Sequence, residues 1–277
     1  MKEKDILRLK ALYEKLQNYI DHPWILRHRP FHVVGNVYFV GNNYVSSFLI
    51  DGGKDGLLLI DCAFQETAYL LFDSIRALGF DPANIRRLFL SHGHVDHCGA
   101  ARLVQEYSGC EVFLGERDHF FFTERPDLIL FEKHVPRFPI HHFYEYDKPI
   151  VWGNTSITPV LTPGHTPGTT SFLIHTPYRG DSVTCAMHGG IGINGLSREE
   201  LTENRLPLTL QQEFLNSLER MKKEKVEVIL ASHAHQYNML ERAARDDGTG
   251  AAFLDDGTGW SGMMEKHIAL VKELMEE

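Results

Sequence analysis

The stretch Ser91-His92-Gly93-His94-Val95-Asp96-His97 places three imidazoles and a carboxylate within six positions, directly after the apolar run Leu88-Phe89-Leu90. In an extended segment, alternate side chains point the same way, so His92, His94 and Asp96 are expected to share one face. The alternative is a polar loop that happens to contain histidines. The order and spacing of these residues instead favour a metal site.

A bend in this stretch completes the set of candidate ligands. Gly93 allows the backbone to turn, and a helix that starts after Val95 would bring His97 toward the other three side chains. Neutral imidazole and carboxylate oxygen bind Zn²⁺ readily, and catalytic sites keep one position open for water. Four ligands in one stretch therefore predict two metal ions.

Two downstream histidines are candidates for the remaining ligands. His165 lies in Thr162-Pro163-Gly164-His165-Thr166-Pro167-Gly168, where a Pro-Gly pair on each side predicts a constrained turn. His233 follows the buried-strand pattern of residues 226–232, at the carboxyl end where α/β sheets place their sites. Either histidine alone would be read as a turn or surface residue, but beside the first motif both are expected to bind metal.

These motifs resemble the metallo-β-lactamase superfamily, whose H-x-H-x-D-H signature is matched in full. The resemblance extends from about Phe31 to the C-terminus, because further family motifs follow in order: Val37 to Gly41, Gly56 to Asp61, Thr162 to Gly168 and Ile229 to His233. The chain is most similar to the third subclass of metallo-β-lactamases. This resemblance implies that one zinc is held by His92, His94 and His165 and the other by Asp96, His97 and His233.

One segment departs from the pattern of glyoxalase II and the lactonases, which place a metal-bridging Asp after the strand that follows the His165 turn. Here the comparable residues are Thr184-Cys185-Ala186-Met187-His188-Gly189-Gly190, without a carboxylate. Asp181 is the nearest, but Tyr178-Arg179-Gly180-Asp181 is typical of a hairpin turn. His188 is therefore a candidate seventh ligand, substrate contact or supporting residue, or simply a structural histidine. We expect it to face the site without joining the metal ions, and to act on the substrate or on the second zinc.

Composition favours one large domain over residues 1–277, with an amphipathic N-terminal helix over residues 1–22 as an extension. The chain is 43% hydrophobic and 23% charged, and no linker divides it. Its net charge of −9 argues against a nucleic-acid partner and leaves a small-molecule substrate. No segment is apolar for long enough to span a membrane. Cys62, Cys98, Cys110 and Cys185 lack paired spacing, which is typical of reduced thiols in a cytoplasmic protein.

Hydrophobic patterning predicts alternating strands and helices in both halves of the chain. The predicted strands are 32–40, 44–51, 57–61, 87–90, 111–114, 150–152, 156–161, 170–175, 182–187 and 226–231. The predicted helices are 1–20, 65–78, 99–107, 209–223 and 261–275. Two mixed sheets flanked by helices are expected, and the family resemblance identifies them as a four-layer αβ/βα sandwich with metals at its edge. The loop 116–146, rich in aromatic residues and histidines, is expected beside that site, with most of its rings packing the loop itself.

The ligand chemistry predicts a dinuclear zinc-dependent hydrolase. A hydroxide bound to the metals would attack the carbonyl of a β-lactam, lactone, ester or thioester, with Asp96 as a catalytic residue that orients it. The alternatives are an iron-containing oxidoreductase of the same fold and a glyoxalase II-like thioesterase, and iron or manganese would then replace zinc. A structural metal scaffold is disfavoured because structural zinc sites are closed by four protein ligands.

Overall fold

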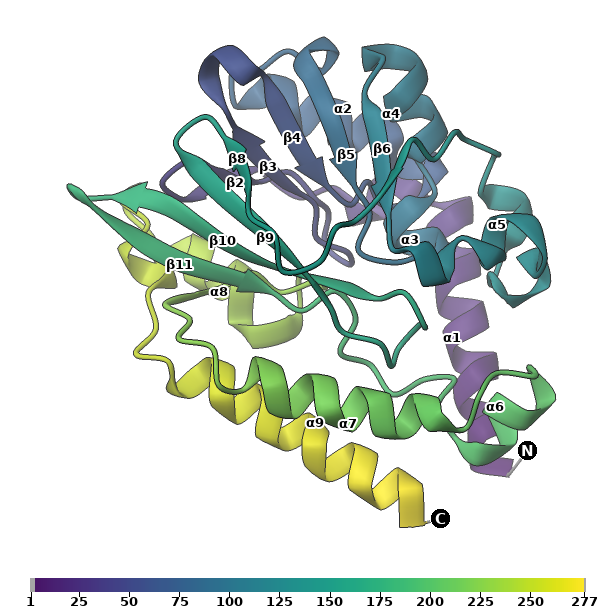
Figure 1. The fold of residues 1–277 in the computed structure, drawn as a ribbon. Coiled ribbons are helices and arrows are strands. Elements are labelled where there is room, and N and C mark those ends of the chain that lie inside the picture. Colours follow the sequence, from purple (N-terminus) through teal and green to yellow (C-terminus); the bar gives the residue numbers. More distant parts are fainter. Residues whose placement is uncertain (1–2, 277) are drawn as a thin grey trace.

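Two β-sheets face one another in the computed structural model, which describes residues 3–276 (Figure 1). Within these residues the first sheet has seven strands in chain order: β1 Phe31–Val34, β2 Val37–Phe39, β3 Phe48–Asp51, β4 Leu57–Ile60, β5 Ile85–Phe89, β6 Glu111–Leu114 and β7 His142–Phe143. The second sheet, over the same range, has five, in the order β12 Val228–Ile229, β11 Asp181–Met187, β10 Thr170–Tyr178, β9 Thr155–Leu161 and β8 Ile150–Trp152.

Both sheets are mixed, as the sequence predicted. In the first, β1 to β4 pair antiparallel and β4 to β7 pair parallel. In the second, β8 to β11 are antiparallel and β12 joins β11 in parallel. The parallel segments matter for function because the carboxyl ends of β5 and β6 then lie at one edge, where the loops that follow them meet.

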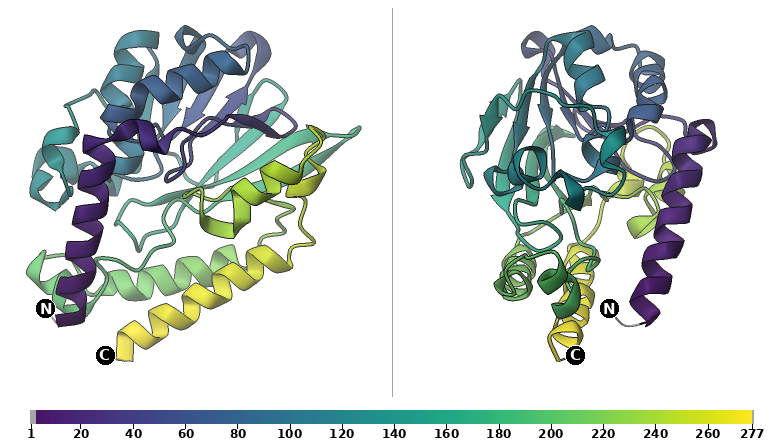
Figure 2. Two further views of the ribbon diagram at one scale, coloured as in Figure 1. Left: turned by 180° about the vertical axis from the view of Figure 1, so that it is seen from behind. Right: turned by 90° about the vertical axis from the view of Figure 1, so that its right-hand side faces the viewer.

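Helices cover the outer faces of the two sheets (Figures 1 and 2). The α-helices of the described part of the chain are α1 Glu3–Asp21, α2 Ala68–Ala77, α3 Val95–Cys98, α4 Ala101–Ser108, α5 Phe120–Thr123, α6 Arg198–Glu203, α7 Thr209–Met221, α8 Met239–Arg245 and α9 Thr258–Glu276. Helices α2 and α4 pack on the first sheet, and α7 and α9 on the second. The layers are thus those of an αβ/βα sandwich. None of the helices in residues 3–276 combines the length and apolarity needed to cross a bilayer.

The main core lies between the sheets, and the strand sequences explain why. Phe48 and Ile50 of β3 point into this core, while Leu49 between them packs under α2 and α4. A strand buried on both faces needs a continuous apolar run instead of an alternating one. Phe172 and Ile174 of β10 complete the same layer from the second sheet.

The sequence located most elements but misjudged the first strand. The predicted strand 32–40 is a hairpin of β1 and β2, because Gly35 adopts φ +55° and turns the chain. The predicted turn at Tyr178 to Asp181 is confirmed, since these two residues pair at the end of the β10–β11 hairpin. The N-terminal helix is also confirmed over its described part, while Met1 and Lys2 lie outside the described residues. The sequence did not predict α5, α6, α8 or β7.

Candidate metal centre

The metal motif lies in the loop that connects β5 to α3. The chain leaves β5 after Phe89, and α3 begins at Val95. His94 occupies the position before the helix, with extended backbone at φ −82° and ψ 152°. This change from extended to helical backbone turns Asp96 and His97 back toward His92 and His94, as predicted. The loop keeps this path because Asp61, directly after β4, accepts hydrogen bonds from the Ser91 backbone and the Ser91 hydroxyl, both at 2.7 Å.

Gly93 is required by packing at the centre of the motif. A Cβ atom at this position would lie 2.8 Å from the Phe121 ring of α5, closer than real contacts allow. The ring of Phe121 is itself buried and close to His94, with 6.1 Å between the two ring centroids. Helix α5 therefore supports the loop from behind.

Two further segments from the second sheet deliver His165 and His233. His165 lies in the turn between β9 and β10, which is closed by a hydrogen bond from the Thr162 backbone to the Thr169 carbonyl at 2.9 Å. His233 follows β12 and forms an isolated bridge with Val45, so the connection between β2 and β3 fixes its backbone. The site thus lies where the loops of the two sheets meet.

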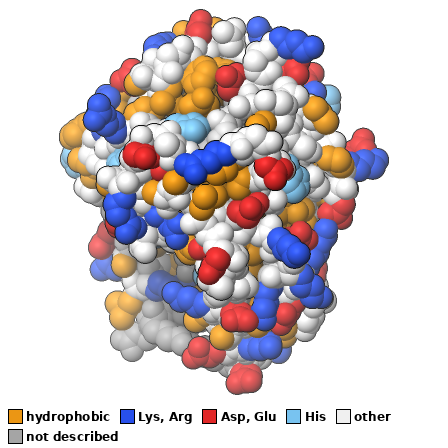
Figure 3. Space-filling model, turned by 90° about the vertical axis from the view of Figure 1, so that its left-hand side faces the viewer, with side chains coloured by type: hydrophobic (Ala, Val, Ile, Leu, Met, Phe, Trp, Pro, Cys, Tyr) orange, Lys and Arg blue, Asp and Glu red, His pale blue; other side chains and the backbone are white. Residues whose placement is uncertain are grey.

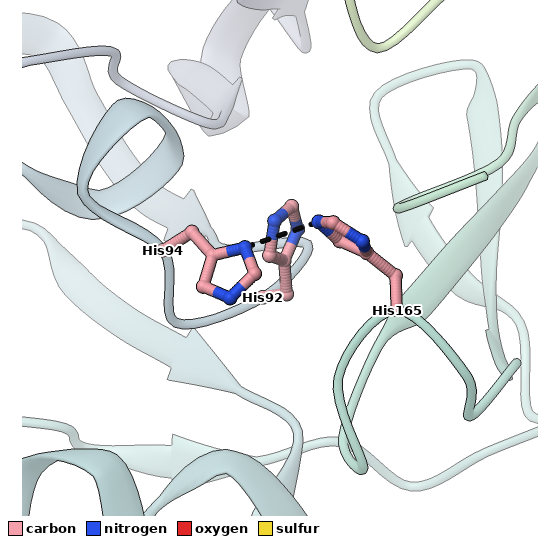
Figure 4. Close-up of side chains that lie close together, drawn as sticks. All are labelled: His92, His94 and His165. Carbon is pink, nitrogen blue, oxygen red and sulfur yellow. Dashed lines mark hydrogen bonds between the residues drawn. The ribbon is translucent and has the colours of Figure 1, made fainter. Parts of the chain in front are cut away.

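The structure brings the six predicted ligands together in two groups of three. Within each group the candidate ligand atoms all lie within 4.8 Å of one another: His92, His94 and His165 in one, and Asp96, His97 and His233 in the other. In the first group, His94 Nδ1 and His165 Nε2 are 3.0 Å apart, and the His92 ring lies beside them (Figure 4). In the second, Asp96 Oδ2 lies 3.7 Å from Nε2 of both His97 and His233.

Four of the imidazoles are held at Nδ1, which leaves Nε2 facing the centre. Side-chain oxygens contact two of them: Ser91 Oγ lies 3.0 Å from His92 Nδ1, and Asp61 Oδ2 lies 2.7 Å from His97 Nδ1. Backbone carbonyls contact the other two: that of Gly192 lies 3.1 Å from His165 Nδ1, and that of Tyr44 lies 3.1 Å from His233 Nδ1. Partners of this kind orient metal-binding histidines. His92 Nε2 is buried and has no hydrogen-bond partner among the described residues. The donor set therefore fits divalent metal ions.

The environment keeps most of these rings neutral, which is the form that binds metal. Burial, reinforced by neighbouring imidazoles, lowers the pKa of His94 to about 3, and burial likewise lowers the pKa of His165 and of His233 to about 4. His97 differs: burial opposes its protonation, but the carboxylates of Asp96 and Asp61 outweigh burial and raise its pKa. Burial would raise the pKa of Asp96, but the surrounding histidines lower it, so Asp96 is a carboxylate at neutral pH.

Sequence reasoning missed two buried carboxylates that build the site. Asp61 orients His97 and adopts φ +56°, a conformation that is rare for residues other than glycine. Asp118 joins the two ligand loops, because it accepts hydrogen bonds from the Gly93 backbone, the Gly168 backbone and the Thr166 hydroxyl at 3.0, 2.6 and 2.7 Å. Asp61 ends the motif Gly56 to Asp61 but was given no role there, and Asp118 lies in the loop 116–146, so only the fold shows what each carboxylate contacts.

His188 does not lie where we expected it. Its buried ring packs against Phe214 of α7, with 6.1 Å between ring centroids, and it belongs to neither group of candidate ligands. The backbone of Gly190 takes its place beside the site, since a Cβ atom there would lie 2.7 Å from the His165 ring. The chain turns at the glycine pair after β11, and this turn leaves His188 on the helical side of the second sheet.

Two adjoining cavities open onto the six residues. One, of about 300 Å³, is lined by His94, Asp96, His165 and His233, and the other, of about 260 Å³, by His92, His97, His165 and His233. The loop 116–146 does border the first cavity, but it contributes Asp127, Leu128 and Leu130 to the lining and none of its aromatic rings. Those rings pack elsewhere, as Phe122 does against Phe138.

Comparison with known proteins agrees with this geometry. Residues 40–177, about half of the chain, match the model of the metallo-beta-lactamase superfamily. The chain belongs to this superfamily. Among curated proteins it is 31% identical over 113 residues to the N-acyl homoserine lactonase AttM of Agrobacterium fabrum, an alignment that covers 38% of this chain and 41% of the lactonase. It is 27% identical over 156 residues to the hydroxyacylglutathione hydrolase GloC of Haemophilus influenzae, an alignment that covers 47% of this chain and 71% of the hydrolase.

Solved structures extend the likeness of the fold to almost the whole chain. The subclass B3 metallo-beta-lactamase BJP-1 of Bradyrhizobium japonicum superposes with a TM-score of 0.80 at 22% identity, covering 91% of this chain and 96% of that one. The native FEZ-1 metallo-beta-lactamase of Legionella gormanii superposes with a TM-score of 0.80 at 21% identity, and the match covers 91% of this chain and 97% of that one. The curated lactonase is matched over only about two fifths of its length, whereas these structures are matched over nearly all of theirs.

Proposed function

We propose that this protein is a hydrolase with two zinc ions, which cleaves a carbonyl compound of the lactam, lactone, ester or thioester class. The observation that carries the proposal is the convergence of five imidazoles and one carboxylate, in two groups, on two adjoining cavities. The lactonase and hydrolase relatives and the beta-lactamase fold support the reaction class. Metal ions in these groups would lower the pKa of a water molecule and polarise a carbonyl oxygen.

In the proposed reaction, Asp96 is the catalytic carboxylate. Its Oδ2 lies between the Nε2 atoms of His97 and His233 and lines the cavity, so it can accept a hydrogen bond from the attacking water and orient it. Because the histidines keep its pKa low, Asp96 stays ionised and able to accept that hydrogen bond at neutral pH. Asp61 acts through His97, whose ring it holds.

The proposed substrate is a small molecule. The cavity volume of about 300 Å³ is at the lower end of the range for small-molecule sites. A nucleic-acid substrate is disfavoured by the net charge of −9. On the face shown in Figure 3, basic and acidic side chains are intermingled, so this face has no continuous basic surface for phosphates. We also propose that residues 1–277 act as one domain, because each ligand group combines loops of both sheets.

A reducing compartment such as the cytoplasm is the proposed location. The four cysteines support it, since all are buried and none forms a disulfide. Fractionation of source cells, with the protein detected by antibody, tests this proposal. Recovery from an exported fraction would contradict it.

Metal analysis combined with a substrate panel tests the function. We expect about two zinc ions per chain and zinc-dependent hydrolysis of at least one lactam, lactone, ester or thioester, with phosphodiesters inert. His165→Ala and His233→Ala should each lower both zinc content and rate, whereas His142→Ala, at an exposed histidine of β7, should change neither. Coloured protein that contains mainly iron and lacks hydrolytic activity would instead favour the oxidoreductase alternative.

A further inference from the structure

Helix α1 forms one wall of the cavity above the candidate ligands. Leu9, Leu12 and Leu16 line this cavity together with Leu128 and Leu130 of the loop after α5. The same cavity is lined at its base by His94, Asp96, His165 and His233. The leucine wall is therefore continuous with the site at which the carbonyl would be cleaved.

Several contacts hold α1 in this position. At its carboxyl end, Leu16 and Ile20 are buried in a core cluster with Phe64 and Val95. In its middle, the Tyr13 ring stacks on Phe131, with 4.4 Å between the centroids. These contacts join the helix to the body of the protein and to the loop that forms the rest of the wall.

The amino-terminal half of α1 is tied to α6 across the cavity. Arg8 Nη2 lies 3.1 Å from Oε1 of Glu200, a carboxylate that is only 4% exposed. The other oxygen of Glu200 accepts hydrogen bonds from the Ser197 backbone and hydroxyl, which cap α6. Because one carboxylate serves both contacts, the start of α6 and the start of α1 are fixed together, and Figure 1 shows the two helices side by side.

The lining of the cavity is mixed, and five of its apolar side chains are the leucines of α1 and of the loop after α5. Asp127, Asn194, Gly195 and Asn204 also line this cavity. Leu130 is 37% exposed, and Leu9 and Leu12 are only partly buried, so a ligand would remove further apolar surface from water. Apolar side chains that gather at a concave site of this kind mark a binding surface.

We infer that the substrate carries an unbranched apolar chain that lies against Leu9, Leu12, Leu128 and Leu130 while its carbonyl lies beside Asp96. Helix α1 is then a specificity-determining element, and the Arg8–Glu200 ion pair is its positioning contact. This inference rests on the proposed hydrolase function for the cleavage step, but binding of the chain depends on the leucine wall alone.

A series of p-nitrophenyl esters from acetyl to octanoyl measures the chain preference. For the wild-type protein, kcat/KM should rise about two- to fourfold per added methylene. Leu9→Ala and Leu12→Ala should flatten this rise, so that their loss of rate grows with chain length to about tenfold for the octanoyl ester. Leu7→Ala is the matched control, because Leu7 lies on the outer face of α1 and is 60% exposed.

Two further measurements separate this inference from the hydrolase proposal. Calorimetric titration of the purified protein should show N-octylacetamide binding at least tenfold more tightly than N-ethylacetamide, and Leu12→Ala should abolish the difference. Arg8→Met should weaken the preference and Arg8→Lys should restore part of it. Equal binding of the two amides, or a flat ester profile, overturns the inference. Chain-dependent amide binding without hydrolysis of any lactam, lactone, ester or thioester leaves the inference standing and overturns the hydrolase proposal.

Discussion

Four of the five imidazoles of the candidate metal centre are oriented by a second contact on the far nitrogen. Backbone carbonyls hold His165 and His233, whereas side-chain oxygens hold His92 and His97. A carbonyl can only accept a hydrogen bond, so it fixes the proton on Nδ1 and leaves a lone pair on Nε2. The rings are thereby prepared to bind a cation before any cation arrives.

Asp96→Asn should reduce kcat at saturating zinc by at least a hundredfold. The amide is a poorer metal ligand than the carboxylate, and it no longer offers the anionic oxygen that orients the water. Steady-state kinetics with measured zinc content checks the result, and Asp73→Asn, at an exposed carboxylate of α2, is the control. Near-wild-type turnover by the Asp96 variant would refute the assigned role.

His188 should make stability depend on pH. Burial lowers its pKa to about 3, so between pH 3 and 6.5 the unfolded chain binds the proton that the folded protein excludes. The free energy of unfolding is therefore highest, as far as His188 determines it, above pH 6.5, and it falls as the pH decreases toward 3. From pH 7 to pH 5 the wild type should lose about 2 kcal/mol more than His188→Gln, measured by urea denaturation. Equal losses in the two proteins would show that solvent reaches His188.

At the level of single residues, the sequence identified the ligands that share a motif and missed Asp61 and Asp118, which lie outside that motif. His92, His94, Asp96 and His97 are recognisable because their spacing repeats a known chemistry. Asp61 and Asp118 are separated from them by many residues, and a lone aspartate has the same appearance in a turn, on a surface or beneath a metal. The position of His188 differs from the expected one because it depends on the turn at Gly189 and Gly190 after β11, and no pattern in the sequence gives the direction of that turn.

Two loops of different sheets are joined by Asp118, and its removal should loosen both. Asp118→Ala leaves the buried amides of Gly93 and Gly168 without their acceptor, although it also removes a carboxyl group whose pKa burial raises to about 6. We expect a net loss of about 2 kcal/mol in the free energy of unfolding, together with weaker zinc binding. Thermal denaturation and zinc titration check this prediction. Unchanged zinc affinity would mean that each loop keeps its shape unaided, and Glu116→Ala is the neighbouring control.

Elements that depend on local signals could be predicted, and those that depend on distant contacts could not. Strand β6 and the β10–β11 hairpin match their predicted positions because apolar alternation and the Arg179–Gly180 turn are local features. The β1–β2 hairpin was read as one strand because its turn at Gly35 interrupts an otherwise strand-like pattern. Strand β12 is shorter than its apolar run, since the chain leaves the sheet to place His233.

Across the whole molecule, metal ions at this site would connect the two sheets. Chelation should therefore lower the melting temperature, on the order of 10 °C, because an ion at a thousandfold excess over its Kd contributes about 4 kcal/mol. Differential scanning calorimetry with and without chelator measures the shift, and added zinc should reverse it. A His165→Ala, His233→Ala double variant should respond much less to chelator. Equal shifts in both proteins would place the stabilising ion elsewhere.

The position of the site between the sheets also has a kinetic consequence. His94 and His165 are 71 residues apart in the chain, and they meet only after both sheets have formed and docked. We expect a contact of such long range to form late on the folding pathway, after the rate-limiting barrier, because the cost of closing the intervening chain precedes the gain from the contact. Loading with metal should then leave the refolding rate nearly constant and lower the unfolding rate. The ion would prolong the lifetime of the native state without hastening its formation.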